Sequence, residues 1–188
     1  MRIDADGSPH AYKPGGGALD FLANAGKPGN WYGIVCNSAG EPVVQGANDP
    51  APGYYISPSA LSDKTKKLTD PRRYVDSEVV PYIAIPPEMK TEHGVRLGDL
   101  CVVGYRETWS PALVADIGPR GKHGEGSIAL AKALEIPPSP RNGGVDRGVV
   151  YVIFPGTAKG WPRPGFEAEA STALLAWGGP LKILSVPL

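Results

Sequence analysis

Two acidic residues near the middle of the chain have the types and the spacing of a catalytic pair. Asp116 ends an apolar run, 112–116, that is typical of a buried strand, and Glu125 follows nine residues later, just before a helical pattern begins. Burial at the strand end should raise the pKa of the Asp116 carboxyl, whereas the free N–H groups at a helix start favour ionised Glu125. One carboxyl group would then donate a proton while the other accepts one.

The segment between the two acids could hold them apart. It is the glycine-rich loop Gly-Pro-Arg-Gly-Lys-His-Gly of residues 118–124. Its length permits the separation of about 6.5–9.5 Å found between the acid and the base of inverting glycoside hydrolases. In the alternative interpretation, Asp116 pairs with Arg120 or Lys122, and Glu125 only caps the helix that begins at Ser127. The spacing taken alone favours this second, structural interpretation.

Three motifs resemble the signature of family 75 glycoside hydrolases, the chitosanases. They are Asp-Ile-Gly-Pro at 116–119, Gly-Glu-Gly-Ser-Ile-Ala-Leu-Ala at 124–131 and Tyr-Val-Ile-Phe-Pro-Gly at 151–156. Shorter matches at 54–57, 74–76, 80–82 and 98–99 extend the resemblance over residues 31–156. It implies an inverting endo-hydrolase of partly or fully deacetylated chitin, with Asp116 and Glu125 as its catalytic pair.

The same resemblance implies a fold and a division of roles. The fold is the double-psi β-barrel, shared with family 45 endoglucanases, expansins and lytic transglycosylases. In those relatives an Asp at the end of a barrel strand is the proton donor, which by analogy makes Asp116 the acid and Glu125 the base. Two other functions stay open: a peptidoglycan-cleaving muramidase or lytic transglycosylase of the same fold, and a non-catalytic glycan-binding module.

Binding of chitosan requires further side chains, because each deacetylated sugar carries an ammonium group that needs an anionic or aromatic partner. The candidate carboxylates are Asp6, Asp20, Asp49, Asp76 and Asp99. For each of them a role in a turn or helix cap is favoured over a substrate contact, because Asp is a common turn residue. The candidate aromatic contacts are Trp31, Tyr32 and Trp109. Since neighbouring side chains on a strand point to opposite faces, we expect one of Trp31 and Tyr32 in the core and the other exposed.

Short runs rich in aromatic and β-branched residues, separated by Gly, Pro, Asn and Asp, predict many short strands. The expected strands are 31–35, 42–45, 54–57, 79–85, 100–105, 112–116, 149–154 and 181–186. Helical spacing predicts helices over 18–25, 127–134 and 167–177. Together with the resemblance, these patterns give a mainly β fold, a six-stranded double-psi β-barrel-like core with two or three peripheral α-helices.

The length of 188 residues suits one catalytic domain. In it we expect residues 1–30 to form an N-terminal extension, 31–156 the barrel core, and 157–188 a C-terminal helix and final strand. The motif Asp4-Ala-Asp6-Gly7 lacks the further oxygen ligands of a calcium loop, so a turn is expected there. The three histidines are far apart and no Cys-x-x-Cys occurs, which indicates neither a bound metal nor a cofactor. Cys36 and Cys101 could form a disulfide or stay free thiols.

The overall charge excludes some partners. With 19 basic and 19 acidic residues, the chain has no net attraction for a polyanion, so nucleic acid is not expected as a partner. No run approaches the roughly 20 apolar residues that span a bilayer, and the first residues lack the pattern of a signal peptide. We therefore expect a monomer that binds a polysaccharide and no membrane, and that is secreted as a mature chain, with the cytoplasm as the alternative.

Overall fold

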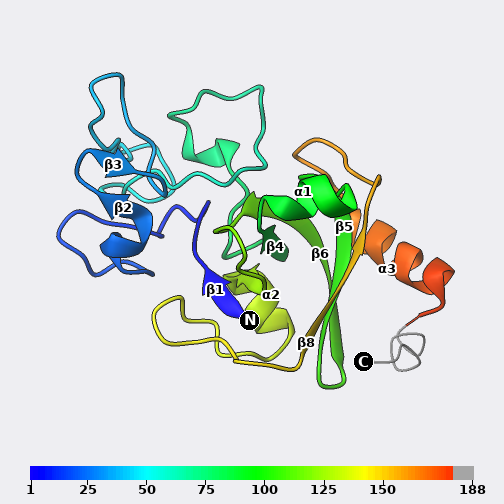
Figure 1. Ribbon diagram of the computed structural model, residues 1–188. Coiled ribbons are helices and arrows are strands. Elements are labelled where there is room, and N and C mark those ends of the chain that lie inside the picture. The colour runs from blue at the N-terminus through cyan, green and yellow to red at the C-terminus, as the bar shows by residue number, and fades with distance from the viewer. Residues whose placement is uncertain (180–188) are drawn as a thin grey trace.

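A mixed six-stranded sheet forms the centre of the molecule in the computed structural model, which describes residues 1–179 (Figure 1). The strand order is β1-β7-β4-β6-β5-β8. Their bounds are β1 Arg2–Asp4, β4 Tyr82–Ile85, β5 Leu100–Tyr105, β6 Thr108–Ile117, β7 Glu125–Ser127 and β8 Val149–Phe154. The pairs β1–β7 and β4–β6 are parallel, and the other pairs are antiparallel.

Three α-helices and two short 3-10 helices accompany the sheet. They are α1 Glu88–His93, α2 Ile128–Ala133, α3 Phe166–Trp177, η1 Leu22–Ala25 and η2 Pro71–Arg73. The mainly β class with three helices is as expected, and α2 and α3 lie where helical spacing predicted them. The described strands do not close into a barrel. The last expected strand, 181–186, lies outside the described residues.

Apolar side chains cover both faces of the sheet, as strand alternation requires. On one face Ile83 and Val114 pack with Leu130 of α2. On the other face Tyr82 and Leu113 pack with the apolar side of α3. Helix α3 therefore shields one face while α2 shields part of the other (Figure 1).

The sheet is curled, so that its two ends approach each other. Ile3 of β1 and Tyr151 of β8 belong to the same apolar cluster although their strands are at opposite edges. The Tyr151 hydroxyl also lies 3.7 Å from the place where a Cβ on Gly124 would stand, immediately before β7. This curl partly encloses the space in front of β7.

The N-terminal segment is part of the central sheet, which corrects the expected division of the chain. β1 pairs along its length with β7, in the register Arg2 to Glu125 and Asp4 to Ser127. The expected extension 1–30 therefore supplies an edge strand of the core. The pattern was missed because three residues with one apolar member, Ile3, give too short an alternation to indicate a strand.

Residues 8–75 form a loop-rich lobe beside the sheet (Figure 1, blue to cyan). This lobe contains little regular strand. A two-stranded ribbon forms from β2 Gly26–Lys27 and β3 Asn30–Trp31, and isolated bridges occur elsewhere. They replace the expected strands 31–35, 42–45 and 54–57. The expected helix 18–25 is only the 3-10 helix η1. Closely spaced Gly and Pro interrupt regular pairing here, so the backbone forms turns instead.

The alternative left open for the two cysteines is decided by the fold. Cys36 and Cys101 are free thiols, and Cys101 is fully buried within β5, where burial raises the pKa of its thiol. Separately, no helix within residues 1–179 has the length and apolar character needed to cross a bilayer.

Ser127 joins β7 to α2 and connects three segments. Its buried hydroxyl accepts hydrogen bonds from the amides of Leu130 and Tyr82, both at 3.0 Å, and donates to the Val80 carbonyl at 2.8 Å. The bond to Leu130 is the helix cap that the sequence indicated. Because Glu125 begins the same short strand, this hydroxyl also fixes the position of Glu125.

Replacing Ser127 by Ala should destabilise the protein by roughly 2–4 kcal/mol, because it removes a helix cap and leaves buried partners unpaired. Urea unfolding measures this loss. The matched control is Ser171→Ala in α3, whose hydroxyl bonds only to Glu167 on an exposed surface and whose loss should cost less than about 0.5 kcal/mol. Equal losses in the two variants would contradict the role given to Ser127.

Candidate functional site

Asp116 and Glu125 are brought to the same face of the sheet by a single residue between them. Ala84 of β4 is paired with Asp116 on one side and with Glu125 on the other. Since neighbouring strands are about 4.8 Å apart, the two backbones are separated by roughly 10 Å with Ala84 between them. Directly paired residues point to the same face, so both carboxyl groups stand above Ala84.

A bulge at the end of β6 is what turns Asp116 toward this face. The register passes from the pair Ile83–Val114 to the pair Ala84–Asp116, so that Ala115 is an extra residue. In a regular strand Asp116 would point to the same side as Val114, into the apolar core. The bulge places it instead beside Ala84, as bulges near functional sites commonly redirect one side chain.

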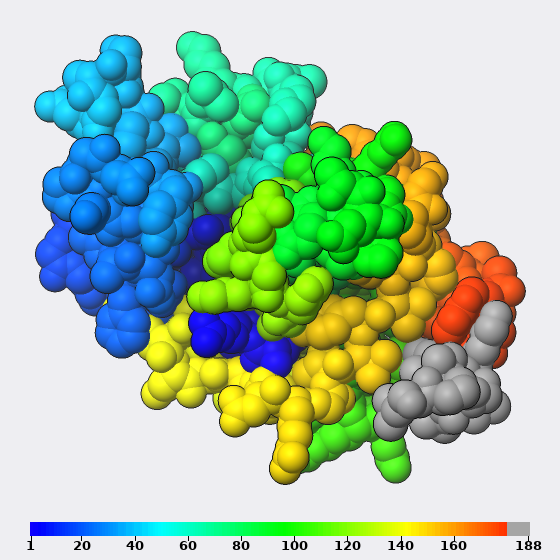
Figure 2. Space-filling view, viewed as in Figure 1, coloured from blue at the N-terminus to red at the C-terminus, as the bar shows by residue number. Residues whose placement is uncertain are grey.

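A cleft of about 570 Å³ opens above Ala84 and contains both acids. It is bordered by β1, by residues of the loop-rich lobe, by the loop after β6 and by residues 140–143. In Figure 2 the dark blue start of the chain is visible in the gap between the blue lobe and the yellow-green loop. The acidic residues in the lining are Asp4, Asp6, Asp20, Asp116 and Glu125, and the basic ones are Arg2, Lys122 and Arg141.

Asp116 is 8% exposed and makes no ion pair with any residue of 1–179. Its Oδ1 accepts hydrogen bonds from the amides of Ile117 at 2.7 Å and Ala60 at 3.1 Å. Burial raises its pKa well above the ordinary value, and the nearby charges of Asp4 and Glu125 act in the same direction, while the two amides oppose them. The surroundings of Asp116 therefore favour its neutral form more than water does.

Glu125 lies in a more polar part of the cleft. Burial raises the pKa of its carboxyl, but the positive charges of Arg2 and Lys122 counteract the rise. Its Oε2 lies over Gly118, only 2.6 Å from where a Cβ on that residue would stand, so a side chain at position 118 would displace it. Glu125 therefore reaches from β7 toward the end of β6, where Asp116 is.

The structural alternative for these two acids is not what the fold shows. Arg120 extends to Glu88 of α1, at 4.0 Å, rather than to Asp116. Lys122 lines the cleft and has no ion pair within 4.0 Å among the described residues. The cap of α2 is Ser127 and not Glu125. Both acids are thus left available to the cleft.

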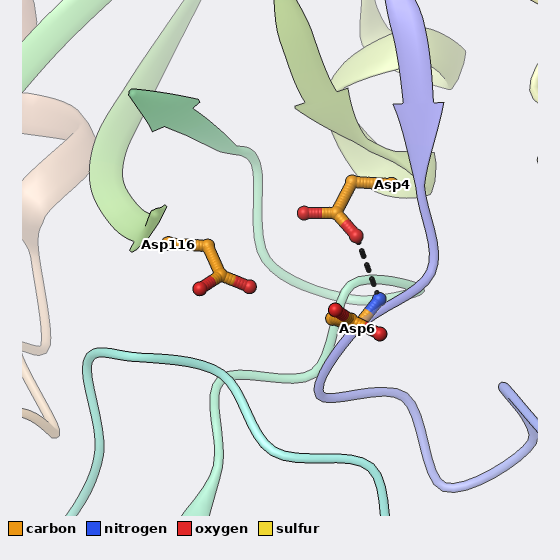
Figure 3. Close-up of side chains that lie close together, drawn as sticks. All are labelled: Asp4, Asp6 and Asp116. Carbon is orange, nitrogen blue, oxygen red and sulfur yellow. Dashed lines mark hydrogen bonds between the residues drawn. The ribbon is translucent and has the colours of Figure 1, made fainter. Parts of the chain in front are cut away.

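Two further carboxyl groups, Asp4 and Asp6, lie beside Asp116. All three point toward one another, Asp4 from β1 and Asp6 from the turn that follows (Figure 3). Asp4 accepts a hydrogen bond from the Asp6 amide at 2.8 Å, and Asp6 Oδ1 accepts from Tyr12 at 2.9 Å and Ser57 at 3.1 Å. Burial raises the pKa of Asp4 to about 6, and the charge of Glu125 adds to the rise. Burial and the charges of Asp4 and Asp116 raise the pKa of Asp6 well above its ordinary value.

This trio is the group among residues 1–179 whose His, Cys, Asp and Glu side chains are close enough to share a cation. One oxygen from each residue lies within 4.8 Å of the others. Mg²⁺ and Ca²⁺ prefer six or more oxygen ligands, so three carboxylates would need water or substrate to complete the shell. The raised pKa values show that protons compete for the same oxygens. The expectation of no bound metal stays a prediction.

Some of the expected substrate contacts line the cleft and others do not. Asp6 and Tyr32 line the cleft, and so does Asp20. Tyr32 is 66% exposed while Trp31 packs against the core, so the expected alternation of this pair is confirmed.

The remaining expected contacts lie outside the cleft. Trp109 covers Gly104 in the strand pair β5–β6. Asp99 is fully buried and accepts a hydrogen bond from the Arg96 amide, which makes it a turn residue. Asp76 borders a separate hollow, and Asp49 pairs with Arg72 at the surface.

Sequence reasoning missed Asp4 as a site residue. The motif Asp4-Ala-Asp6-Gly7 was interpreted as a turn, and the turn at Asp6-Gly7 is present. Its pairing with β7 could not be seen, because the partner lies far along the chain. The three residues Arg2, Ile3 and Asp4 alternate, but they are too few to indicate a strand.

The comparisons with known proteins give no independent identification. No family model matches the chain, and no curated protein matches it.

Asp4→Asn should change how stability depends on pH. The pKa of Asp4 is about 6 in the folded state against an ordinary 3.8, so the folded state binds this proton more tightly than the unfolded state. Protonation of Asp4 therefore stabilises the fold. This contribution is fully present below about pH 4 and is lost as the pH rises through 6. Asn is neutral at every pH, so the variant should gain up to about 3 kcal/mol on the parent between pH 4 and pH 7.5.

Urea unfolding of parent and variant at the two pH values measures that gain. Glu92→Gln, which removes an exposed carboxylate outside the cleft lining, is the control and should show no such change. A difference between Asp4→Asn and parent that is the same at both pH values would contradict the assignment.

Proposed function

We propose that the protein is an endo-acting, inverting glycoside hydrolase that cleaves the β-1,4 bonds of chitosan. The observation that carries this proposal is the placement of Asp116 and Glu125 on either side of Ala84, facing one cleft. The motif resemblance supports the same pair and the same substrate. The finer fold, a double-psi β-barrel, belongs to this proposal and is supported by the six strands and the curl of the sheet.

The separation supports inversion. A backbone distance of roughly 10 Å across β4 leaves room for the 6.5–9.5 Å between carboxyl groups that admits a water beside the sugar. In a retaining enzyme the two groups would stand only about 5 Å apart. The water would be activated from the Glu125 side and the glycosidic oxygen protonated from the Asp116 side.

The two environments support these roles. In Asp116 both amide donors bind Oδ1, so a proton on this carboxyl resides on Oδ2, from which it can pass to the leaving oxygen. Glu125 is near Arg2 and Lys122, whose charges favour its ionised form. The activity should therefore have a bell-shaped pH profile, falling at low pH as Glu125 is protonated and at high pH as Asp116 is ionised.

The charge of the cleft supports an amino-sugar substrate. Its five carboxyl groups outnumber its three basic side chains. Asp4 and Asp6 lie next to Asp116, and no basic residue in the described part of the chain forms an ion pair with either of them. An ammonium group on the bound sugar would relieve the repulsion among these carboxylates, whereas the neutral acetamido group of chitin would not.

Asp116→Asn and Glu125→Gln should each lower the rate of chitosan hydrolysis by a factor of about 10² to 10⁴, because each removes one half of the acid and base pair. Reducing-end release from chitosan, chitin, cellulose and peptidoglycan measures this. Asp146→Asn and Glu92→Gln, both exposed and outside the cleft lining, are the matched controls and should keep parental rates.

The outcomes separate the competing functions. Loss of activity in Asp116→Asn alone, with peptidoglycan as the substrate, would indicate a single-acid lytic transglycosylase. An absence of bond cleavage in the parent, with glycan still bound, would indicate a binding module. Proton NMR of the first product tests inversion, since a β-linkage should yield the α-anomer.

Tyr32→Ala should raise KM for chitosan about fivefold to tenfold while kcat changes little, because an exposed ring at the cleft offers stacking to a sugar and touches neither acid. Steady-state kinetics on soluble chitosan measures the two constants. Tyr32→Phe, which keeps the ring, should behave like the parent. A fall in kcat at unchanged KM would assign Tyr32 a different role.

A further inference from the structure

A second hollow lies next to the cleft, on the other side of one turn of the chain. Its volume is about 380 Å³. Asp6 lines the cleft, and the following residue, Gly7, lines the second hollow. Consecutive Cα atoms are about 3.8 Å apart, so the two hollows border the same turn of the chain, one at Asp6 and the other at Gly7.

Asp76 is the carboxylate of this hollow that has no cation. One of its oxygens accepts the Glu78 amide at 2.9 Å, and none of the ion pairs among the described residues includes it. Burial raises the pKa of its carboxyl, and the charge of Glu78 adds to the rise, while His10 and Lys132 act only from a distance.

The basic residues of the hollow are already engaged. Lys66 pairs with Asp63, which also accepts hydrogen bonds from Thr65. Arg72 pairs with Asp49 and Asp70 and donates to the Asn48 carbonyl at 2.6 Å. Asp76 is therefore the carboxylate in this hollow that is free to form an ion pair with a cationic ligand.

The rest of the wall is apolar and partly aromatic. Val79 is 71% exposed, among the most exposed large apolar side chains in the described part of the chain. Trp161 and Tyr74 contribute ring surface, and four prolines complete the lining. An apolar surface beside one unpaired carboxylate matches a sugar that has an apolar face and one ammonium group.

We propose that this hollow is a second binding site for a glucosamine unit, in which Asp76 binds the ammonium group and Trp161 and Val79 contact the sugar ring. The site rests on the proposed function, since it would hold a part of the chitosan chain that extends beyond the catalytic cleft. It takes no part in bond cleavage. Its effect is on affinity for long substrates.

The experiment measures binding separately from catalysis. A fully deacetylated glucosamine hexamer is titrated into the full chain carrying Glu125→Gln, with and without Asp76→Asn. The temperature and time are chosen so that cleavage by the Glu125→Gln background is negligible. In this comparison the parent is the chain with Glu125→Gln alone. Loss of a hydrogen bond to a charged group should weaken hexamer binding about tenfold. The dimer, which is too short to fill both hollows, should bind parent and variant equally.

Two controls make the result specific. Asp146→Asn changes the net charge equally at an exposed position that lines neither hollow and should leave hexamer binding unchanged. Fully acetylated hexamer, which lacks ammonium groups, should bind parent and Asp76→Asn alike. NMR provides a direct check, since the amide of Glu78, bonded to Asp76, should shift on hexamer addition in the parent and not in the variant.

The outcomes distinguish this inference from the function on which it rests. Equal hexamer affinity in parent and Asp76→Asn, or an equal loss in Asp146→Asn, would overturn the second site while leaving hydrolysis at the cleft intact. Conversely, a specific loss in Asp76→Asn, together with full activity of Asp116→Asn, would support the second site and overturn the catalytic assignment.

Discussion

Several carboxyl groups share the floor of one cleft, and they cannot all be ionised there. Asp4, Asp6 and Asp116 approach within 4.8 Å of one another, with Glu125 close by. Like charges at this range in a partly dry site raise each other's pKa, so protons must be unevenly distributed. Burial raises the pKa of Asp116, the most buried member, well above its ordinary value, whereas the charges of Arg2 and Lys122 counteract the rise at Glu125. Crowding and unequal surroundings thus give the two acids different affinities for a proton.

Short strands of the sheet hold these carboxyl groups close together. β1, β7 and the end of β6 converge around β4, and the bulge at Ala115 turns the last acid toward the others. Bringing the acids together is electrostatically unfavourable. Hydrogen bonds of the surrounding segments, such as those of Ser127 and the bond from Tyr12 to Asp6, offset this unfavourable free energy. A slip of one residue in either pairing would point the acids into the core.

Sequence patterns within single segments predicted the elements whose formation depends on neighbouring residues. The strands β5 and β8, the helices α2 and α3 and the cap at Ser127 follow from alternation, helical spacing and a Ser before an apolar run. The acids Asp116 and Glu125 were found because both belong to one continuous segment. Asp4 was not found, because its place depends on a pairing between distant segments, and the bulge beside Asp116 has no signature in residue type. In the loop-rich lobe, turns at Gly and Pro override the preference of aromatic residues for strands.

The parallel pairing of β1 with β7 joins positions that are separated by most of the chain. Closing so long a loop is entropically unfavourable until the intervening elements have formed, so this contact belongs late in folding. The sheet interior from β4 to β8 can assemble without it, whereas the acid cluster exists only after the first residues have docked. A compact chain in which this edge has not yet joined would retain most of its core and still lack the acid cluster, because the carboxyl groups that repel one another would not yet have been brought together.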